Sequence, residues 1–328
     1  MNDFSLLLPE FLVAGLAFFI LALDLFIKEN WKRHLVWVAF FGLAVILFVS
    51  LFIESEGQLY DGLLEFDEFT KFFRIFFLII GGVTVIISRE YVDSRLKYPG
   101  EYYGILLFTL LGAMLLASSA ELLTAYINLE LLSFGLYVLV GYERYNPKSN
   151  EASVKYILLG AFSSALILFG ISQIYGLLGT TRFDEMSVAF SSLSSISPGM
   201  AVGFVLIVSG LGFKLAAVPF HMWAPDVYEG APLPITAWLS VGSKAAALAL
   251  AIRLFSEGFI SVFGELQPIS VSYYTSDAAD EGLGVDLGGR RIIQKKTSVC
   301  KRDVTVAQRS GETRVHPGTA GVDECASY

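Results

Sequence analysis

Long apolar runs alternate with short polar loops along the first 267 residues of this chain. A helix needs about 20 mostly apolar residues to cross roughly 30 Å of hydrocarbon. Runs of this kind occupy residues 5–27, 34–53, 69–88, 102–119, 121–141, 152–177, 200–223 and 233–255. The first run is too long for a signal-peptide core and lacks a basic flank, so we expect it to persist as a helix. The pattern predicts an all-α, polytopic membrane protein with about eight transmembrane helices.

The seventh apolar run is predicted to form a broken helix. It carries Lys214, and Pro219 follows five residues later. Proline removes a backbone donor and interrupts a helix. An interruption at membrane depth is tolerated where the backbone lines a cavity or is covered by protein. We expect Pro219 to distort the helix beside Lys214, and Pro225 to begin a tight turn into the eighth helix.

The composition changes abruptly after residue 267. All 27 phenylalanines and all four tryptophans precede this point, whereas residues 268–328 show no sustained apolar period. Such a segment cannot bury enough apolar area to offset its ordering entropy. We therefore expect a polar, disordered tail over residues 268–328. A slipped reading frame near Gln267 is the alternative.

Charge separates the two sides of the predicted membrane segment. Hydrophobic residues make up 55% of the chain and charged residues only 16%, unlike a soluble domain. Basic residues gather in the first, third and fifth loops: Lys28, Lys32, Arg33, Arg89, Arg95, Lys97, Arg144 and Lys148. The opposite loops hold only Arg182, and the second loop is acidic, so the N-terminus is predicted to face outward. The net charge of −8 comes largely from that outer loop, and we expect no nucleic-acid partner.

Cysteine and histidine give no sign of a metal or haem site. Cys300 and Cys325 lie in the tail, and His34, His221 and His316 are far apart. No spacing typical of zinc, iron–sulfur or haem ligands occurs in the sequence. We therefore expect the chain to bind no metal or cofactor.

Three ionisable residues are predicted to lie near mid-membrane. Glu130 lies near the middle of the fifth run, and Lys214 and Lys244 lie within the seventh and eighth. A charge at that depth costs at least about 2.5–3.5 kcal/mol, so it is a functional hypothesis by default. Burial disfavours a charged lysine, whereas a nearby carboxylate favours it. A Glu130–Lys214 pair could therefore hold a proton when close and release it when separated.

The alternative for that pair is a static ion pair that joins two helices. Lys244, a second lysine without an obvious acid, favours proton transfer, because an unpaired buried charge has no structural benefit. His221 is either a proton relay or a polar histidine at a helix end. Lys155 and Arg253 lie nearer helix ends, where snorkelling to the surface accounts for them.

Three segments of the sequence resemble a known family. They read Glu-Leu-Leu-Ser-Phe-Gly-Leu-Tyr-Val-Leu-Val-Gly-Tyr at 130–142, Glu-Ala-Ser-Val-Lys-Tyr at 151–156, and Gly-Leu-Gly-Phe-Lys-Leu-Ala-Ala-Val-Pro-Phe-His-Met-Trp-Ala-Pro-Asp-Val-Tyr-Glu-Gly-Ala-Pro at 210–232. They resemble subunit N of bacterial NADH-quinone oxidoreductase, the respiratory complex I, over roughly residues 1–267. Related antiporter subunits share the Pro-Phe-His-x-Trp core, but the continuation Pro-Asp-Val-Tyr-Glu-Gly-Ala-Pro, followed by Ser243 and Lys244, looks like subunit N.

The resemblance implies an antiporter-like membrane subunit that couples electron transfer from NADH to quinone with proton movement. It implies that Glu130 and Lys214 form a modulating pair and that Lys244 passes protons on. The chain would then be an enzyme subunit without redox chemistry of its own, since NADH and quinone are substrates of the whole complex. The implied partners are the other membrane subunits of complex I and the lipid bilayer, in the cell inner membrane.

The family is built around two inverted five-helix repeats. The resemblance implies an N-terminal three-helix segment at 1–100 and one five-helix repeat at 101–267, so the chain as written would be truncated after its first repeat. Two alternatives stay open. One is a cation/proton antiporter or membrane-bound hydrogenase subunit of the same fold, and the other is a non-conducting truncated remnant.

Overall fold

The structure is a computed structural model that describes residues 4–53, 56–96, 98–192 and 197–260. These residues belong to one compact unit, Met1–Tyr273. The predictions made for the tail, residues 268–328, lie outside the described residues.

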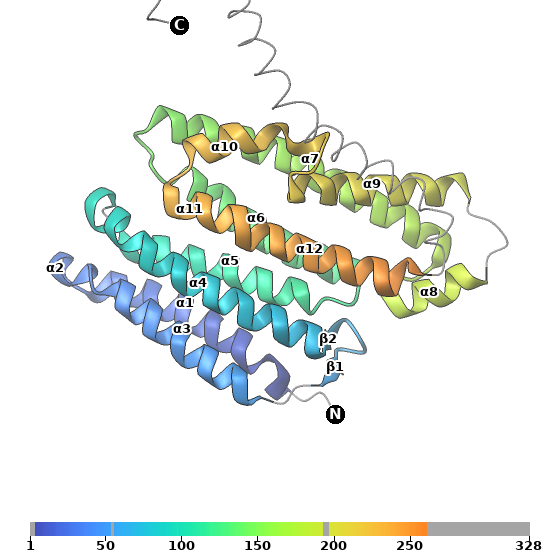
Figure 1. The fold of residues 1–328 in the computed structure, drawn as a ribbon, viewed down its shortest axis with the longest axis horizontal. Helices are drawn as coiled ribbons and strands as arrows, with labels where there is room; N and C mark the ends of the chain where they lie inside the picture. Colours follow the sequence, from blue (N-terminus) through green and yellow to red (C-terminus); the bar gives the residue numbers. More distant parts are fainter. Residues whose placement is uncertain (1–3, 54–55, 97, 193–196, 261–328) are drawn as a thin grey trace, which may run out of the picture. The chain divides into compact units, whose positions relative to one another are not determined.

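Eight helical segments in the described ranges are long and apolar enough to cross a membrane. Figure 1 shows the long helices running roughly parallel to one another. The prediction of an all-α, polytopic membrane fold is confirmed for this part of the chain. The third segment, Glu68–Arg95, is longer than its apolar run at 69–88, because the helix continues into polar residues at its end.

Six of these segments contain one long helix each. They are α1 (Leu8–Phe26, preceded by the 3-10 turn η1, Phe4–Leu7), α3 (Leu35–Phe52), α4 (Glu68–Arg95), α5 (Pro99–Ala117), α6 (Leu122–Val140) and α7 (Pro147–Leu178). The seventh segment contains α9 (Pro198–Leu215), the 3-10 turn η2 (Phe220–Trp223) and α10 (Ala224–Gly230). The eighth contains α11 (Leu233–Trp238), the π-helical turn η3 (Leu239–Ser243), α12 (Lys244–Arg253) and a second π-helical turn, η4 (Leu254–Gly258). Two short helices, α2 (Glu29–Lys32) and α8 (Phe183–Ser191), lie in the connections.

The seventh segment breaks one residue beyond Lys214. Helix α9 ends at Leu215, and Ala216 takes the left-handed backbone conformation with a φ of 56°. The carbonyl of Phe213 in the last turn accepts a hydrogen bond from Nε1 of Trp223 at 2.9 Å. The predicted broken helix is confirmed, and the break begins before Pro219.

The prediction that Pro225 begins a turn is wrong. Pro225 lies in the first turn of α10, and Ala231 and Pro232 make the connection to α11. Proline fits the first turn of a helix because its missing N–H would have no helical partner there. The chain therefore regains helical structure before the eighth segment.

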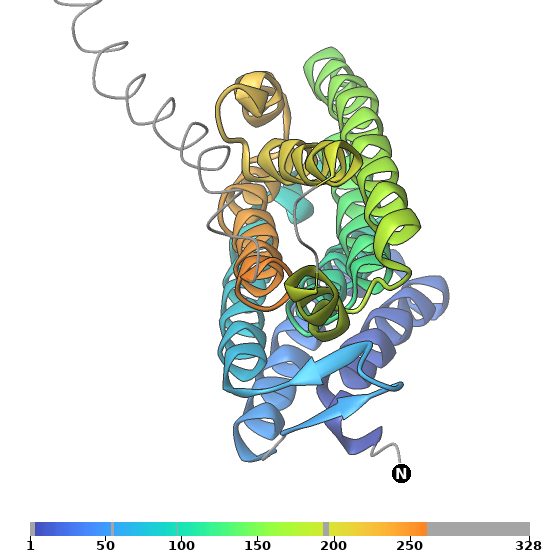
Figure 2. The same ribbon diagram turned by 90° about the vertical axis from the view of Figure 1, so that its right-hand side faces the viewer.

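A small hairpin lies in the loop between α3 and α4. Its strands, β1 (Gly57–Leu59) and β2 (Leu64–Phe66), pair antiparallel with Gln58 opposite Glu65. Its apolar side chains pack with those of η1 in a second, small core. Figure 2 shows the hairpin across one end of the helices. The sequence reading missed these strands, because each has only three residues.

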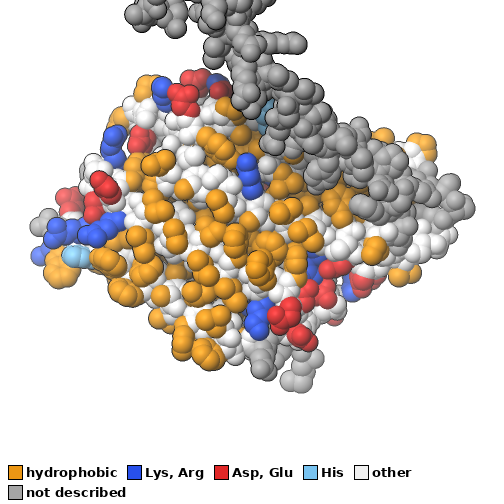
Figure 3. Space-filling model, in the orientation of Figure 1, with side chains coloured by type: hydrophobic (Ala, Val, Ile, Leu, Met, Phe, Trp, Pro, Cys, Tyr) orange, Lys and Arg blue, Asp and Glu red, His pale blue; other side chains and the backbone are white. Residues whose placement is uncertain are grey.

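Helices α7 and α9 pack closely through glycine. A methyl group added to Gly170 would lie 2.7 Å from the carbonyl oxygen of Gly203, so only a residue without a side chain allows this approach. Large apolar side chains such as Phe18, Phe48 and Phe162 are more than half exposed on the outside. Figure 3 shows hydrophobic side chains across the middle of one face and most charged side chains toward its margins, as a membrane-embedded surface requires.

Candidate functional site

Lys214 and Glu130 form an ion pair inside the helical bundle. The Lys214 side chain is 6% exposed and that of Glu130 is 13% exposed, and Nζ lies 3.7 Å from Oε1. The ammonium also donates hydrogen bonds to Ser133 Oγ at 2.7 Å and to Tyr137 Oη at 3.4 Å. The structure therefore brings together the acid and the first of the two lysines that the sequence singled out.

Helix geometry explains why one face of α6 meets the lysine. Glu130, Ser133 and Tyr137 are spaced three and four residues apart, so they lie on the same side of the helix. Ser133 donates its own hydrogen bond to the carbonyl of Leu129 at 2.7 Å, which leaves an oxygen lone pair to accept from Lys214. Lys214 lies in the last turn of α9, where the helix dipole favours a cation.

Helix α7 completes the surroundings of the acid. Ser164 Oγ donates a hydrogen bond to Glu130 Oε1, and Ser163 Oγ donates one to the carbonyl of Gly210 on α9 at 3.0 Å. The pair thus lies where α6, α7 and α9 meet. A movement of α6 relative to α9 would change the distance between the carboxylate and the ammonium.

Four aromatic rings, Tyr137, Tyr156, Trp223 and Tyr228, make a continuous contact that we call the aromatic bridge. Tyr137 meets Tyr156 edge-on at 4.7 Å between ring centroids, Tyr156 stacks on Trp223 at 4.8 Å, and Trp223 meets Tyr228 edge-on at 6.0 Å. Lys214 Nζ lies 5.8 Å from the centroid of Tyr137, at one end of the bridge. The sequence reading did not predict this bridge, although all four residues lie in the segments that it quoted.

Lys244 lies at the other end of the aromatic bridge. Its Nζ is 5.6 Å from the centroid of the Tyr228 ring. The residue is half-buried and begins α12, directly after the π-helical turn η3. Within the described ranges no carboxylate lies within ion-pair distance of Lys244, so the two lysines have different surroundings.

The side of the pair that faces the hairpin is apolar. A narrow crevice runs there between α6, α7, α9 and α12. It is lined by Leu122, Ala125, Tyr126, Leu129, Ile167, Ile171, Ile207, Leu211, Leu250 and Leu254. Apart from Tyr126, these residues offer no polar side chain that could accept a proton.

A family model for the NADH:quinone oxidoreductase/Mrp antiporter membrane domain matches residues 119–271, which include this site. Curated relatives named NADH-quinone oxidoreductase subunit N are 41% identical over 260 residues in Desulforamulus reducens and 42% identical over 255 residues in Moorella thermoacetica. Each alignment covers 78% of this chain. The chain belongs to the subunit N family.

The chain spans about half the length of these subunit N relatives, 54% and 53% respectively. Among solved structures, respiratory complex I from Thermus thermophilus matches with a TM-score of 0.63 and 30% identity, covering 75% of this chain and 53% of that chain. An Mrp complex from Dietzia sp. matches with a TM-score of 0.64 and 23% identity, covering 77% of this chain and 28% of that chain. The Mrp likeness shows the fold alone.

His221 is not part of the arrangement around the Glu130–Lys214 pair. It lies on η2 with an exposed side chain, and no hydrogen bond or ion pair joins it to Glu130, Lys214 or Lys244 in the described structure. A relay role for His221 stays a prediction.

The snorkelling interpretation is wrong for Arg253. Its side chain is 1% exposed and forms ion pairs with Asp67 at 2.8 Å, Glu257 at 3.2 Å and Glu65 at 3.3 Å. These contacts tie the end of α12 to the hairpin and to α4. The sequence could not show this, because Glu65 and Asp67 are far from Arg253 along the chain. Lys155, in contrast, is partly exposed and forms an ion pair with Asp226.

A second buried ion pair was also missed. Arg74 Nε on α4 donates to Glu10 Oε1 on α1 at 2.9 Å, and Arg74 Nη2 donates to the carbonyl of Leu6 at 3.1 Å. Both side chains are almost fully buried. Each lies close to one end of its apolar run, where a charged residue is expected at the membrane boundary and gives no sign of burial.

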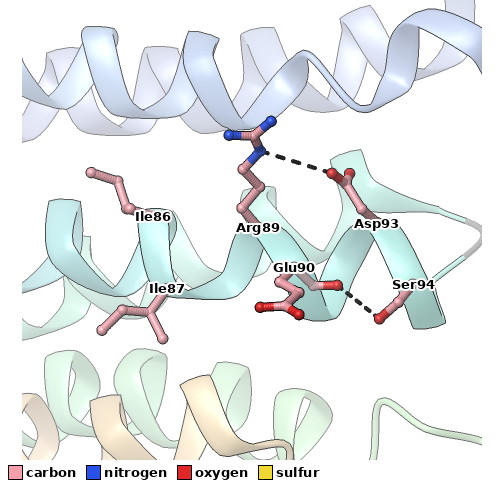
Figure 4. A pocket seen from close by; sticks show the side chains of 6 residues that line it. All are labelled: Ile86, Ile87, Arg89, Glu90, Asp93 and Ser94. Carbon is pink, nitrogen blue, oxygen red and sulfur yellow. Dashed lines mark hydrogen bonds and ion pairs between the residues drawn. The ribbon is translucent and has the colours of Figure 1, made fainter.

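The shallow pocket of Figure 4 lies at the end of α4 and does not reach the Glu130–Lys214 pair. Its charged residues are exposed, with Arg89 Nε 3.9 Å from Asp93 Oδ2, and Ser94 Oγ donates to the backbone of Glu90. Within the described ranges no group of three histidine, cysteine or acidic residues could hold a metal ion. That the chain binds no cofactor stays a prediction.

Proposed function

We propose that the chain is a proton-translocating membrane subunit of an NADH-quinone oxidoreductase. The observation that carries the proposal is the buried Glu130–Lys214 pair, with Lys214 in the last helical turn before a break. A pair that only joins two helices needs no break beside it. Membership of the subunit N family and the likeness to complex I support the same setting.

The pair can act as a switch because its parts are on different helices. Ser133 and Glu130 stabilise the protonated Lys214 when they are close. Redox chemistry elsewhere in the complex would change the electric field at Glu130 and lengthen the separation, which releases the proton. The crevice on the hairpin side of the pair is apolar. The proton would therefore leave on the opposite side, where the aromatic bridge leads to Lys244.

The proposal also covers the surroundings of the chain. Its partners would be the other membrane subunits of complex I and the bilayer of the cell inner membrane. NADH and quinone would be substrates of the whole complex. The N-terminus would lie on the outer face, on the side without basic loops. We also propose a three-helix segment at 1–100 followed by a five-helix repeat at 101–267; the two share one core, since α1 packs against α5.

The test is Lys214→Ala in the chain as the cell makes it, assembled in its complex. We expect NADH-coupled proton translocation in membrane vesicles to fall at least about tenfold, because a positioned proton carrier contributes a hundredfold or more. The control is Lys28→Ala, which removes an exposed lysine from the connection between α1 and α3. Normal translocation in the Lys214→Ala complex, assembled to normal amounts, would remove the mechanism.

A further inference from the structure

Lys244 needs a partner for its charge that the described carboxylates do not supply. The Tyr228 ring, 5.6 Å from Nζ, is the contact found for this ammonium in the described structure. An aromatic face attracts a cation, and the attraction is greater where water is excluded. The ring therefore takes the part that Glu130 takes for Lys214.

Tyr228 is itself held in place from the broken helix. Its ring meets Trp223, whose indole Nε1 donates to the carbonyl of Phe213, the residue before Lys214. Thr236 Oγ1 donates to the carbonyl of Tyr228 at 3.4 Å. The Tyr228 hydroxyl is buried and has no hydrogen-bond partner in the described structure, so the contacts found for this side chain are those of its ring.

We propose that Tyr228 is the positioning residue for Lys244, and that the aromatic bridge passes movements of the α9 end to it. This rests on the proposed function, because it assigns how the second lysine receives its proton. When α9 moves, Phe213 shifts Trp223, Trp223 shifts Tyr228, and the ring carries the ammonium toward or away from the pair. The π-helical turn before Lys244 widens the backbone there, a feature that is frequent at functional sites.

The experiment compares two substitutions of Tyr228 in the assembled complex. Tyr228→Phe keeps the ring, and we expect it to retain more than half of the proton translocation. Tyr228→Leu removes the ring, and we expect translocation to fall about three- to thirtyfold, the range that a cation–π contact covers between water-exposed and water-excluded settings. Tyr145→Leu is the matched control, since Tyr145 is fully exposed. The amount of assembled complex is measured for each variant, and Tyr228→Met replaces the leucine variant if that one does not accumulate.

Two outcomes would overturn the inference. Normal translocation in Tyr228→Leu would show that Lys244 does not need the ring, and an equal loss in Tyr228→Phe would show that the hydroxyl is the important group. Lys214→Ala and Lys244→Ala are measured in parallel. If both are defective while Tyr228→Leu is normal, only the inference fails; if both are normal, the proposed function itself fails.

Discussion

Ser133 shows how much a single hydroxyl can contribute at the residue scale. It accepts a hydrogen bond from Lys214 Nζ and donates one to the α6 backbone, each at 2.7 Å. The ammonium therefore approaches Glu130 through a group that is fixed to the helix. A hydrogen bond to a charged group contributes about 1.5–3 kcal/mol.

Replacing Ser133 with alanine should weaken the hold on the charged lysine without removing either charge. We expect NADH-coupled proton translocation to fall roughly tenfold, which corresponds to about 1.4 kcal/mol. Ser94→Ala is the matched control, because Ser94 makes the same backbone bond four residues back at 2.7 Å but is exposed at the end of α4. Equal proton translocation by both variants in membrane vesicles would show that the hydrogen bond between Ser133 and Lys214 does not contribute to translocation.

The residues that sequence reasoning found and those that it missed differ in a physical way. Glu130, Lys214 and Lys244 could be proposed from the sequence because a charge inside an apolar run is a local signal with a known cost. Ser133 and Tyr228 were not singled out because serine and tyrosine are ordinary in such helices, and the roles proposed for them rest on contacts between helices. Contacts between helices become visible only when the packing of the helices is known, and they cannot be read from the sequence of one segment.

At the scale of elements, the break in the seventh segment and the approach of α7 to α9 belong together. The proline after Lys214 is a local signal, so the break could be predicted, whereas the left-handed Ala216 that begins it could not. The glycines that let α7 approach α9 also lack a local signature, since Gly170 and Gly203 acquire their meaning only as neighbours. The approach also brings Ser163 of α7 within hydrogen-bond distance of the Gly210 carbonyl on α9.

A methyl group at Gly170 should separate the two helices. It would lie 2.7 Å from the Gly203 carbonyl oxygen, and backbone cannot move away without shifting its helix. We expect Gly170→Ala to destabilise the protein by about 1–3 kcal/mol, measured as a lower midpoint of thermal unfolding in detergent. Gly176→Ala on the same helix meets nothing within 4 Å and should be neutral or slightly stabilising, because alanine favours helix. A fall in both midpoints would point to α7 itself rather than to its contact with α9.

At the scale of the whole molecule, the sequence was sufficient for the number of spans but not for what joins them. Hydropathy predicts spans because every backbone polar group in lipid must be satisfied within its own helix. The hairpin, the α8 helix and the buried Arg253 were missed because they depend on loops that fold back on the bundle. The distribution of basic loop residues still predicts which side faces out.

The orientation can be tested by labelling single cysteines with a membrane-impermeant maleimide. Cys300 and Cys325 are first replaced with serine, and cysteine then replaces either Glu68, which is exposed beside the hairpin, or Tyr145 in the loop between α6 and α7. We expect the cysteine at 68 to react from outside the membrane and the cysteine at 145 only in inverted vesicles. The opposite pattern would reverse the proposed orientation, and detergent-permeabilised samples show that both positions can react.

The surroundings of Arg253 have a consequence for biogenesis. Glu65 and Asp67 are synthesised 188 and 186 residues before the arginine that pairs with them. Until the eighth segment enters the membrane, these hairpin carboxylates have no guanidinium and remain in water. The contacts at the hairpin end of the bundle therefore form last, and a ribosome must deliver almost the whole described chain before the hairpin reaches its final place.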